Sequence, residues 1–236
     1  MKKQTKLVAV LSTAALLAIG ASMTSFAATG WAEEDGTWVY YDRNGDKVTD
    51  KWAKSGNNWY YLDSNGEMAV DQLIEDGDNY YYVDVNGVMA ANQWVAIDNE
   101  DAGDDDEPEH YWYYFQANGK ALKQGDSDTV SLKTVNGKKY AFDEYGAMVA
   151  EWSLDEDDEK KASDTEAQEA ASTASTSEAW EGNGKYAKYT QAWKYYNSVE
   201  DGSRVSKGWF KVVPAEMLNK EKYDDDEESW YYADGS

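Results

Sequence analysis

The chain places short aromatic and apolar stretches between polar turn residues, and the pattern recurs along its length. Four stretches share a mostly aromatic segment of three residues, called the triplet below, and a turn glycine seven positions after its first residue. The triplets begin at Trp38, Trp59, Tyr80 and Trp112, and a weaker fifth copy is Tyr140-Ala141-Phe142-Asp143 with Gly146. Successive turn glycines are 21, 21, 32 and 27 residues apart, which indicates a repeat of about 21 residues with two insertions.

Each repeat predicts a β-hairpin. An Asn-Gly pair such as Asn44-Gly45 is typical of a type I′ turn with two positive φ angles, and the residues before it favour β-structure. A second turn lies just upstream, at Asp35-Gly36, Ser55-Gly56, Asp76-Gly77 and Asn136-Gly137. A hairpin of this size cannot bury its own apolar face. The pattern therefore predicts an all-β fold, a solenoid of stacked hairpins in which each copy covers the next.

Strand alternation separates two faces of each hairpin. We assign to the core the face that carries an apolar or aromatic pair in all five copies: Val39 and Tyr41, Tyr60 and Leu62, Tyr81 and Val83, Tyr113 and Phe115, Tyr140 and Phe142. The other face carries Trp38 and Tyr40, Trp59 and Tyr61, Tyr80 and Tyr82, Trp112 and Tyr114, but Lys139 and Ala141 in the fifth copy. The fifth copy lacks these aromatic side chains but keeps the repeat, and such variation is typical of a ligand-binding face. The alternative is that these aromatic residues only pack between hairpins.

A further tryptophan opens most repeats, and methionines follow several turn glycines by two positions. The opening residues are Trp31, Trp52, Trp94 and Trp209, with Leu73 in the third repeat, and the methionines are Met68, Met89 and Met148. In this register the chain resembles the choline-binding or cell-wall-binding repeats of bacterial surface proteins, over roughly residues 30–152 and from about 193 to the end. The resemblance implies a left-handed β-solenoid that holds choline between consecutive hairpins.

In that family, the opening and triplet tryptophans of one repeat and a tyrosine of the next enclose the trimethylammonium group. Because a quaternary ammonium cannot donate a hydrogen bond, aromatic faces must recognise it. Carried over, the first cage is Trp31, Trp38 and Tyr61, and the second is Trp52, Trp59 and Tyr82. The third would contain Leu73, Tyr80 and Tyr114, and the fourth Trp94, Trp112 and Ala141, so each lacks one aromatic member. Met68 and Met89 are further candidate contacts.

Two other functions fit the same residues. Related repeats bind glucans, because pyranose rings also stack on Trp and Tyr, and a structural or adhesive protein would use these rings only for packing. The opening tryptophan favours choline. No stretch of about 100 residues lacks repeat or linker character, so the sequence predicts a non-catalytic module with no cofactor, although the family's repeats commonly accompany wall-degrading domains.

Composition narrows the partners and the chemistry. The 46 acidic residues against 22 basic ones give a formal charge of -24, which disfavours nucleic acid and anionic membrane surfaces. The chain has no cysteine and one histidine, His110, which excludes disulfides, thiolate metal sites, a cysteine nucleophile and multi-histidine metal sites. The expected partner is a choline-bearing wall polymer or another wall glycan.

The first 27 residues are typical of a secretion signal. Lys2, Lys3 and Lys6 precede an apolar stretch from Leu7 to Ile19, and small residues lead to Ala27. That stretch is shorter than the roughly 20 residues that span a bilayer. We therefore expect cleavage after Ala27 and an exported protein associated with the cell wall.

The rest of the chain divides by composition. Residues 28–152 form the predicted repeat region, with an acidic insertion at 98–109; residues 153–179 are a low-complexity linker; residues 180–236 are divergent repeats. The acidic runs at 98–109, 155–159 and 224–228 are interpreted as solvated segments, with calcium binding as the alternative. A triplet that begins at Trp230 would place its turn glycine at position 237, so the chain is expected to be a fragment or a truncated reading frame.

Overall fold

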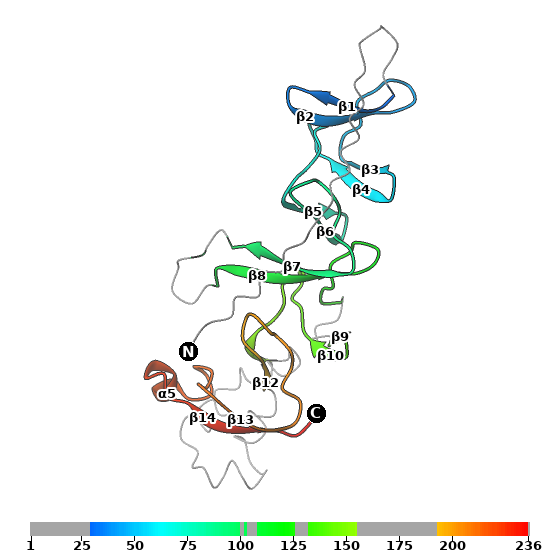
Figure 1. Cartoon of the computed structure of the whole chain (residues 1–236). Helices are drawn as coiled ribbons and strands as arrows, with labels where there is room; N and C mark the ends of the chain where they lie inside the picture. Colours follow the sequence, from blue (N-terminus) through cyan, green and yellow to red (C-terminus); the bar gives the residue numbers. More distant parts are fainter. Residues whose placement is uncertain (1–28, 100–101, 103–107, 126–131, 155–192, 236) are drawn as a thin grey trace, which may run out of the picture. The chain divides into compact units, whose positions relative to one another are not determined.

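A computed structural model of the chain describes residues 29–99, 102, 108–125, 132–154 and 193–235 (Figure 1). The predicted secretion signal at 1–27, most of the linker and the acidic run at 155–159 lie outside these described residues. Fourteen strands are present in the described part: β1 (Gly30–Glu34), β2 (Thr37–Tyr41), β3 (Lys51–Ser55), β4 (Asn58–Leu62), β5 (Gln72–Asp76), β6 (Asn79–Val83), β7 (Gln93–Asp98), β8 (His110–Phe115), β9 (Lys133–Val135), β10 (Lys138–Tyr140), β11 (Glu151–Leu154), β12 (Trp193–Tyr196), β13 (Gly208–Val212) and β14 (Ser229–Ala233).

The strands pair only as hairpins in the described residues. Each sheet has two strands, β1 with β2, β3 with β4, and so on in sequence order to β13 with β14 (Figure 1). The chain divides into two compact units, one with residues up to 74 and 82–89 and the other with 75–81 and 90–236. The prediction of an all-β fold built from antiparallel hairpins is confirmed, and a continuous solenoid over the whole chain stays a prediction.

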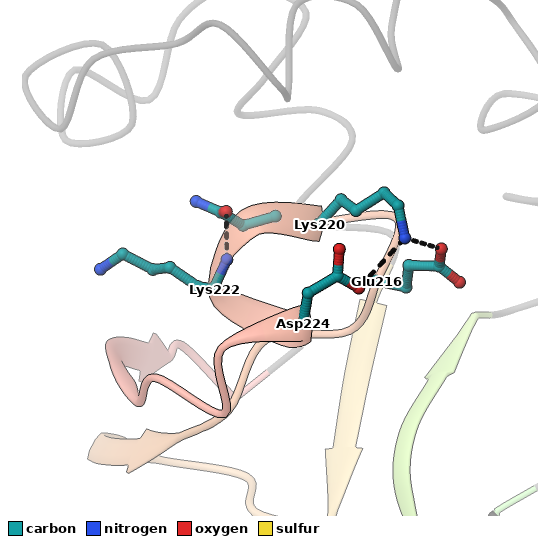
Figure 2. A network of polar contacts seen from close by, with 5 residues as sticks. Glu216, Lys220, Lys222 and Asp224 are labelled. Carbon is teal, nitrogen blue, oxygen red and sulfur yellow. Dashed lines mark hydrogen bonds and ion pairs between the residues drawn. The ribbon is translucent and has the colours of Figure 1, made fainter. Parts of the chain in front are cut away.

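One helix interrupts the β-structure of the described residues. Helix α5 (Lys220–Asp224) begins at Asn219, whose side chain accepts a hydrogen bond from the N–H of Lys222 at 3.1 Å (Figure 2). The Lys220 Nζ atom lies 2.7 Å from the Glu216 carboxylate oxygen Oε1 and 3.1 Å from the Asp224 carboxylate oxygen Oδ1. These pairs are exposed, so they contribute little stability.

In β1–β2, β3–β4, β5–β6 and β9–β10, the upstream turn is the tight turn that joins the two strands. In the β1–β2 turn, both Asp35 and Gly36 have positive φ (51° and 86°), as a type I′ turn requires. Asn44 has no positive φ, and Gly45 alone in that pair adopts it, at 83°. The prediction of type I′ turns at the Asn-Gly pairs is therefore wrong.

An aspartate after the second strand explains the difference. The side chain of Asp42 accepts hydrogen bonds from the N–H of Asn44 (2.8 Å) and of Asp46 (3.0 Å), and its carbonyl oxygen accepts one from the N–H of Gly45 (3.1 Å). Such a side-chain cap holds the first turn residue at negative φ. Asp63, Asp84 and Asp143 accept equivalent hydrogen bonds in their own turns.

The face that was assigned to the core contains the most buried residue of each of the five copies: Val39, Leu62, Val83, Phe115 and Phe142 are exposed by 1% or less. Of their partners on that face, Tyr113 and Tyr140 are buried, whereas Tyr41, Tyr60 and Tyr81 are half-buried. On the other face, Trp38, Tyr61 and Tyr82 are half-buried and Trp59 is 40% exposed. The alternation that was predicted from sequence is confirmed for the core face.

Consecutive hairpins of each unit are joined by backbone and side-chain contacts. The residue two positions after a turn glycine packs against the turn glycine of the next repeat. A Cβ atom on Gly87 would lie 2.9 Å from the Met68 Sδ and Cε atoms, and one on Gly202 would overlap the side chain of Met148. The turn glycine is therefore required both by its positive φ and by this close approach.

Candidate functional site: the aromatic face between hairpins

The opening tryptophan of a hairpin packs edge-on against the tyrosine directly opposite on the second strand. In β1–β2 this pair is Trp31 and Tyr40, with ring centroids 5.3 Å apart. The same pairing occurs at 5.0–5.2 Å in four other hairpins: Trp52 with Tyr61, Trp94 with Tyr114, Trp152 with Tyr195, and Trp209 with Tyr232. The register of the strands thus fixes one wall of an aromatic surface in these five hairpins.

The same tryptophan also contacts the next hairpin. The ring centroids of Trp31 and Tyr60 are 5.2 Å apart, and the two rings meet edge-on. Two other edge-on pairs have similar centroid distances: Trp94 with Tyr140 at 4.9 Å, and Trp152 with Tyr231 at 4.7 Å. In each case the partner is the middle residue of the next triplet, or its equivalent. The opening tryptophan therefore helps to hold successive hairpins together.

The first predicted cage is partly assembled. Trp31 is opposite Tyr40 and Trp38 is opposite Glu33, so Trp31 and Trp38 share one face of β1–β2. The ring of the next hairpin that contacts Trp31 is Tyr60, one residue before the predicted Tyr61, which packs against Trp52 of its own hairpin.

The second predicted cage has the same arrangement of tryptophans. Trp52 is opposite Tyr61 and Trp59 is opposite Lys54, so both tryptophans lie on one face of β3–β4. The hydroxyl group of Tyr82, the predicted third member, donates a hydrogen bond to Asp71. The role of these residues in binding stays a prediction.

The members of the third and fourth predicted cages have other neighbours. The ring centroids of Tyr80 and Tyr145 are 6.3 Å apart, and the Lys123 ammonium lies 5.7 Å from the centroid of the Tyr80 ring. The Tyr114 hydroxyl group donates to Asn92 at 3.2 Å. Ala141 is fully buried, so it presents nothing to a ligand. Leu73 is half-buried in β5.

The methionines connect the repeats. The N–H of Met68 donates to the carbonyl oxygen of Trp38 at 2.7 Å, and that of Met89 donates to Trp59 at 2.9 Å. The Met68 side chain also lies against Gly87, and this packing explains why a methionine occurs two positions after the turn glycine Gly66. A ligand contact by Met68 or Met89 stays a prediction.

A cavity of about 300 Å³ borders Trp112 in the second unit. Its lining includes the aromatic residues Tyr111 and Trp112, Met148, and two acidic residues, Asp143 and Glu151. Burial raises the pKa of Asp143, although hydrogen bonds from the N–H groups of Ala147 and Tyr145 oppose that effect. An aromatic surface beside carboxylates suits a small cation.

Among the described residues, no group of three or more acidic or histidine side chains is arranged to hold a metal ion. The described helix is too short and too polar to cross a membrane.

One hairpin was missed in the sequence. Strand β11 pairs with β12 with Trp152 opposite Tyr195 and Leu154 opposite Trp193, so the predicted boundary at residue 152 falls inside a strand and the linker is an insertion between two paired strands. Trp152 also donates from Nε1 to the carbonyl oxygen of Val213 at 2.8 Å. The sequence signal for this hairpin was the spacing from Gly146 to Trp152. Trp152 follows that turn glycine by six residues, whereas the other opening tryptophans that come after a turn glycine follow theirs by seven.

The profile of the choline-binding repeat family matches residues 28–72 and 48–94. The choline-binding domain of Spr1274 from Streptococcus pneumoniae is 32% identical over 40% of this chain and 95% of that domain, with a TM-score of 0.30. The choline-binding domain of CbpL from the same organism is 23% identical over 89% of this chain and 76% of that chain, with a TM-score of 0.45.

The modular autolysin LytC from Streptococcus pneumoniae, solved with a synthetic peptidoglycan ligand, is 16% identical over 88% of this chain, with a TM-score of 0.47. The match covers 32% of that autolysin, so this chain spans about a third of its length. No curated protein matches the chain.

Proposed function

Because the chain belongs, through residues 28–94, to the choline-binding repeat family, we propose that it is a non-catalytic module that binds choline groups of teichoic or lipoteichoic acid at the bacterial cell wall. The predicted secretion signal at residues 1–27 supports a location outside the cell.

The observation that carries the proposal is that two tryptophans of one hairpin share a face, and that one of them contacts a tyrosine of the next hairpin. Trp31 and Trp38 share one face of β1–β2, and Tyr60 of the next hairpin packs against Trp31. A trimethylammonium group is attracted by the faces of such rings and needs no hydrogen-bond acceptor. In this proposal Tyr60 replaces Tyr61 as the residue that closes the first site.

The second site uses Trp52 and Trp59, which share a face of β3–β4 in the same way. A further site lies at the cavity beside Trp112, where Asp143 and Glu151 add negative charge that favours a cation. The proposal therefore includes sites in both units of the chain.

Each site binds weakly by itself. If each ring contributes about 0.5–2 kcal/mol, three rings give a few kcal/mol, close to the roughly 4 kcal/mol of a millimolar dissociation constant. Retention on the wall requires several sites on one polymer, because the first contact raises the effective concentration for the next.

The test is a titration of the full chain with choline and with tetramethylammonium, followed by tryptophan fluorescence, with dextran as the rival ligand. We expect saturable responses to both ammonium compounds that Trp38→Ala reduces. The matched control is Tyr223→Ala, which removes an aromatic residue that is 39% exposed and belongs to helix α5 instead of a hairpin strand.

A second assay uses binding to walls that contain choline, with free choline as the competitor. A response to dextran alone would transfer the assignment to a glucan-binding module. The absence of any response to the ammonium compounds, in a chain whose near-UV circular dichroism shows a folded state, would overturn the proposal.

A further inference from the structure

One position of each hairpin lies directly opposite the first residue of the triplet, and its charge varies between repeats. Glu33 is opposite Trp38 in β1–β2, and Lys54 is opposite Trp59 in β3–β4. Directly opposed side chains on one face of an antiparallel pair are close enough to interact. The two repeats thus put opposite charges beside equivalent tryptophans.

The ammonium group of Lys54 lies over the ring of Trp59, with Nζ 5.6 Å from the ring centroid. Among the described residues, no carboxylate forms an ion pair with Lys54, while Trp59 is 40% exposed. The ring face on which a cationic ligand would lie therefore already carries a cation of the chain itself.

A lysine opposite the first triplet residue is not sufficient to place an ammonium group over the tryptophan ring. Lys211 is opposite Trp230 in β13–β14, but its Nζ atom lies 2.8 Å from Glu228, which holds it in an ion pair. In β7–β8 the position is Ala96, opposite Trp112, and carries no charge. Lys54 is thus distinguished by the absence of such a carboxylate among the described residues.

We propose that Lys54 is an intramolecular competitor that lowers the affinity of the Trp59 site for simple quaternary ammonium ions, whereas Glu33 raises that of the Trp38 site. The inference rests on the proposed function. A ligand at the Trp59 site displaces the Lys54 ammonium, which then lies beside the bound ligand. There it repels a simple cation and attracts an anionic group, so this site prefers a zwitterion such as phosphocholine more strongly than the Trp38 site does.

The test measures the two sites separately in the full chain. The indole N–H signals of Trp38 and Trp59, assigned with Trp38→Phe and Trp59→Phe, are followed by nuclear magnetic resonance during titration with tetramethylammonium, choline and phosphocholine. Four variants are compared with the unmodified chain: Lys54→Gln, Lys54→Arg, Glu33→Gln and Lys51→Gln. Lys51 lies on the same strand, opposite Leu62 on the other face, so Lys51→Gln removes the same charge without uncovering Trp59.

We expect Lys54→Gln to increase tetramethylammonium affinity at Trp59 about two- to fivefold, the range of one exposed cation–π contact. Lys54→Arg and Lys51→Gln leave that affinity near its original value, and Glu33→Gln lowers the affinity at Trp38. The preference for phosphocholine over choline at Trp59 falls in Lys54→Gln.

The outcomes separate this inference from the proposed function. A response at Trp38 together with an unchanged affinity at Trp59 in Lys54→Gln would overturn the inference and leave the function standing. A response at Trp59 that appears only in Lys54→Gln supports the inference. If neither indole signal moves in any variant, both proposals are wrong.

Discussion

The N–H of Met68 donates a 2.7 Å hydrogen bond to the carbonyl oxygen of Trp38, although the two residues belong to consecutive repeats. Equivalent hydrogen bonds join Met89 to Trp59, Ala121 to Tyr80, Met148 to Trp112 and Arg204 to Lys139. The contact uses only the backbone of the triplet residue, so its side chain can be replaced without loss of this hydrogen bond. Hairpin stacking and ligand recognition can therefore be tested separately at this position.

The two tryptophans of the first site are expected to differ in their effect on stability. Trp31→Ala removes edge-on contacts with Tyr40 and Tyr60 and should lower the free energy of unfolding by about 1–3 kcal/mol. Among the described residues no ring packs against Trp38, so Trp38→Ala should cost less while still reducing the response to choline. Urea unfolding of both variants checks this, and an equal loss of stability would contradict the assignment of Trp38 to a ligand face.

The tyrosine that closes the first site is expected to be Tyr60. Since its ring contacts Trp31, Tyr60→Leu should weaken choline binding at Trp38 about two- to thirtyfold, whereas Tyr61→Leu should act mainly at Trp52. The indole signals of Trp38 and Trp52 in a choline titration give the measurement. A larger effect of Tyr61→Leu at Trp38 would restore the cage predicted from sequence.

The turn glycines are expected to differ in their tolerance of alanine. Gly36→Ala meets no atom within 4 Å and should cost about 1–2 kcal/mol, the penalty of positive φ. In Gly87→Ala the new Cβ would lie 2.9 Å from Met68 and 3.0 Å from the Ala69 carbonyl oxygen, so a further 1–3 kcal/mol or so is expected.

Thermal or urea unfolding measures both variants, and the double variant Gly87→Ala with Met68→Ala should recover part of the second loss. Equal destabilisation by Gly36→Ala and Gly87→Ala would show that the approach of Met68 is unimportant.

Two equivalent turn aspartates should affect stability in opposite directions as pH changes. Burial raises the pKa of Asp143, so its charged form is disfavoured in the folded state, and stability falls as pH rises from the ordinary pKa through the raised value. Hydrogen bonds from the N–H groups of Asp46 and Asn44 lower the pKa of Asp42. Its contribution is therefore present above the ordinary pKa and is lost as pH falls through the lowered value.

The measurement is the free energy of unfolding of Asp143→Asn and Asp42→Asn, relative to the unmodified chain, between about pH 3 and pH 7. As pH rises, the difference should move in favour of Asp143→Asn and against Asp42→Asn. Differences that follow the same slope would contradict the opposite environments of the two turns.

The long insertion between β11 and β12 should be replaceable by a short turn. Leu154 and Trp193 are directly opposed, so Asn-Gly in place of residues 155–192 completes a two-residue hairpin loop. The shorter loop should raise the free energy of unfolding by about 2–3 kcal/mol. Urea unfolding followed by tryptophan fluorescence gives the measurement. A one-residue turn is the control, since it disturbs the register; a loss of stability with Asn-Gly would argue against the β11–β12 pairing.

Local sequence determined the repeat, the hairpins and the core face. Leu62, Val83, Phe115 and Phe142 were assigned to the core from alternation and are almost fully buried, because side chains in a strand change face at every residue. The turn type was harder to predict, since Asn44-Gly45 has the composition of a type I′ turn but the side chain of Asp42 stabilises another.

Tertiary structure decided what depends on the fit between hairpins or on distant segments. The contact of Trp31 with Tyr60 is set by how two hairpins stack, and the pairing of Trp152 with Tyr195 crosses an insertion that no local pattern spans. The position of the Lys54 ammonium over Trp59 likewise depends on strand register and on the carboxylates nearby. Periodicity fixes which face a residue occupies, whereas the neighbour it meets there depends on the packing of the next hairpin.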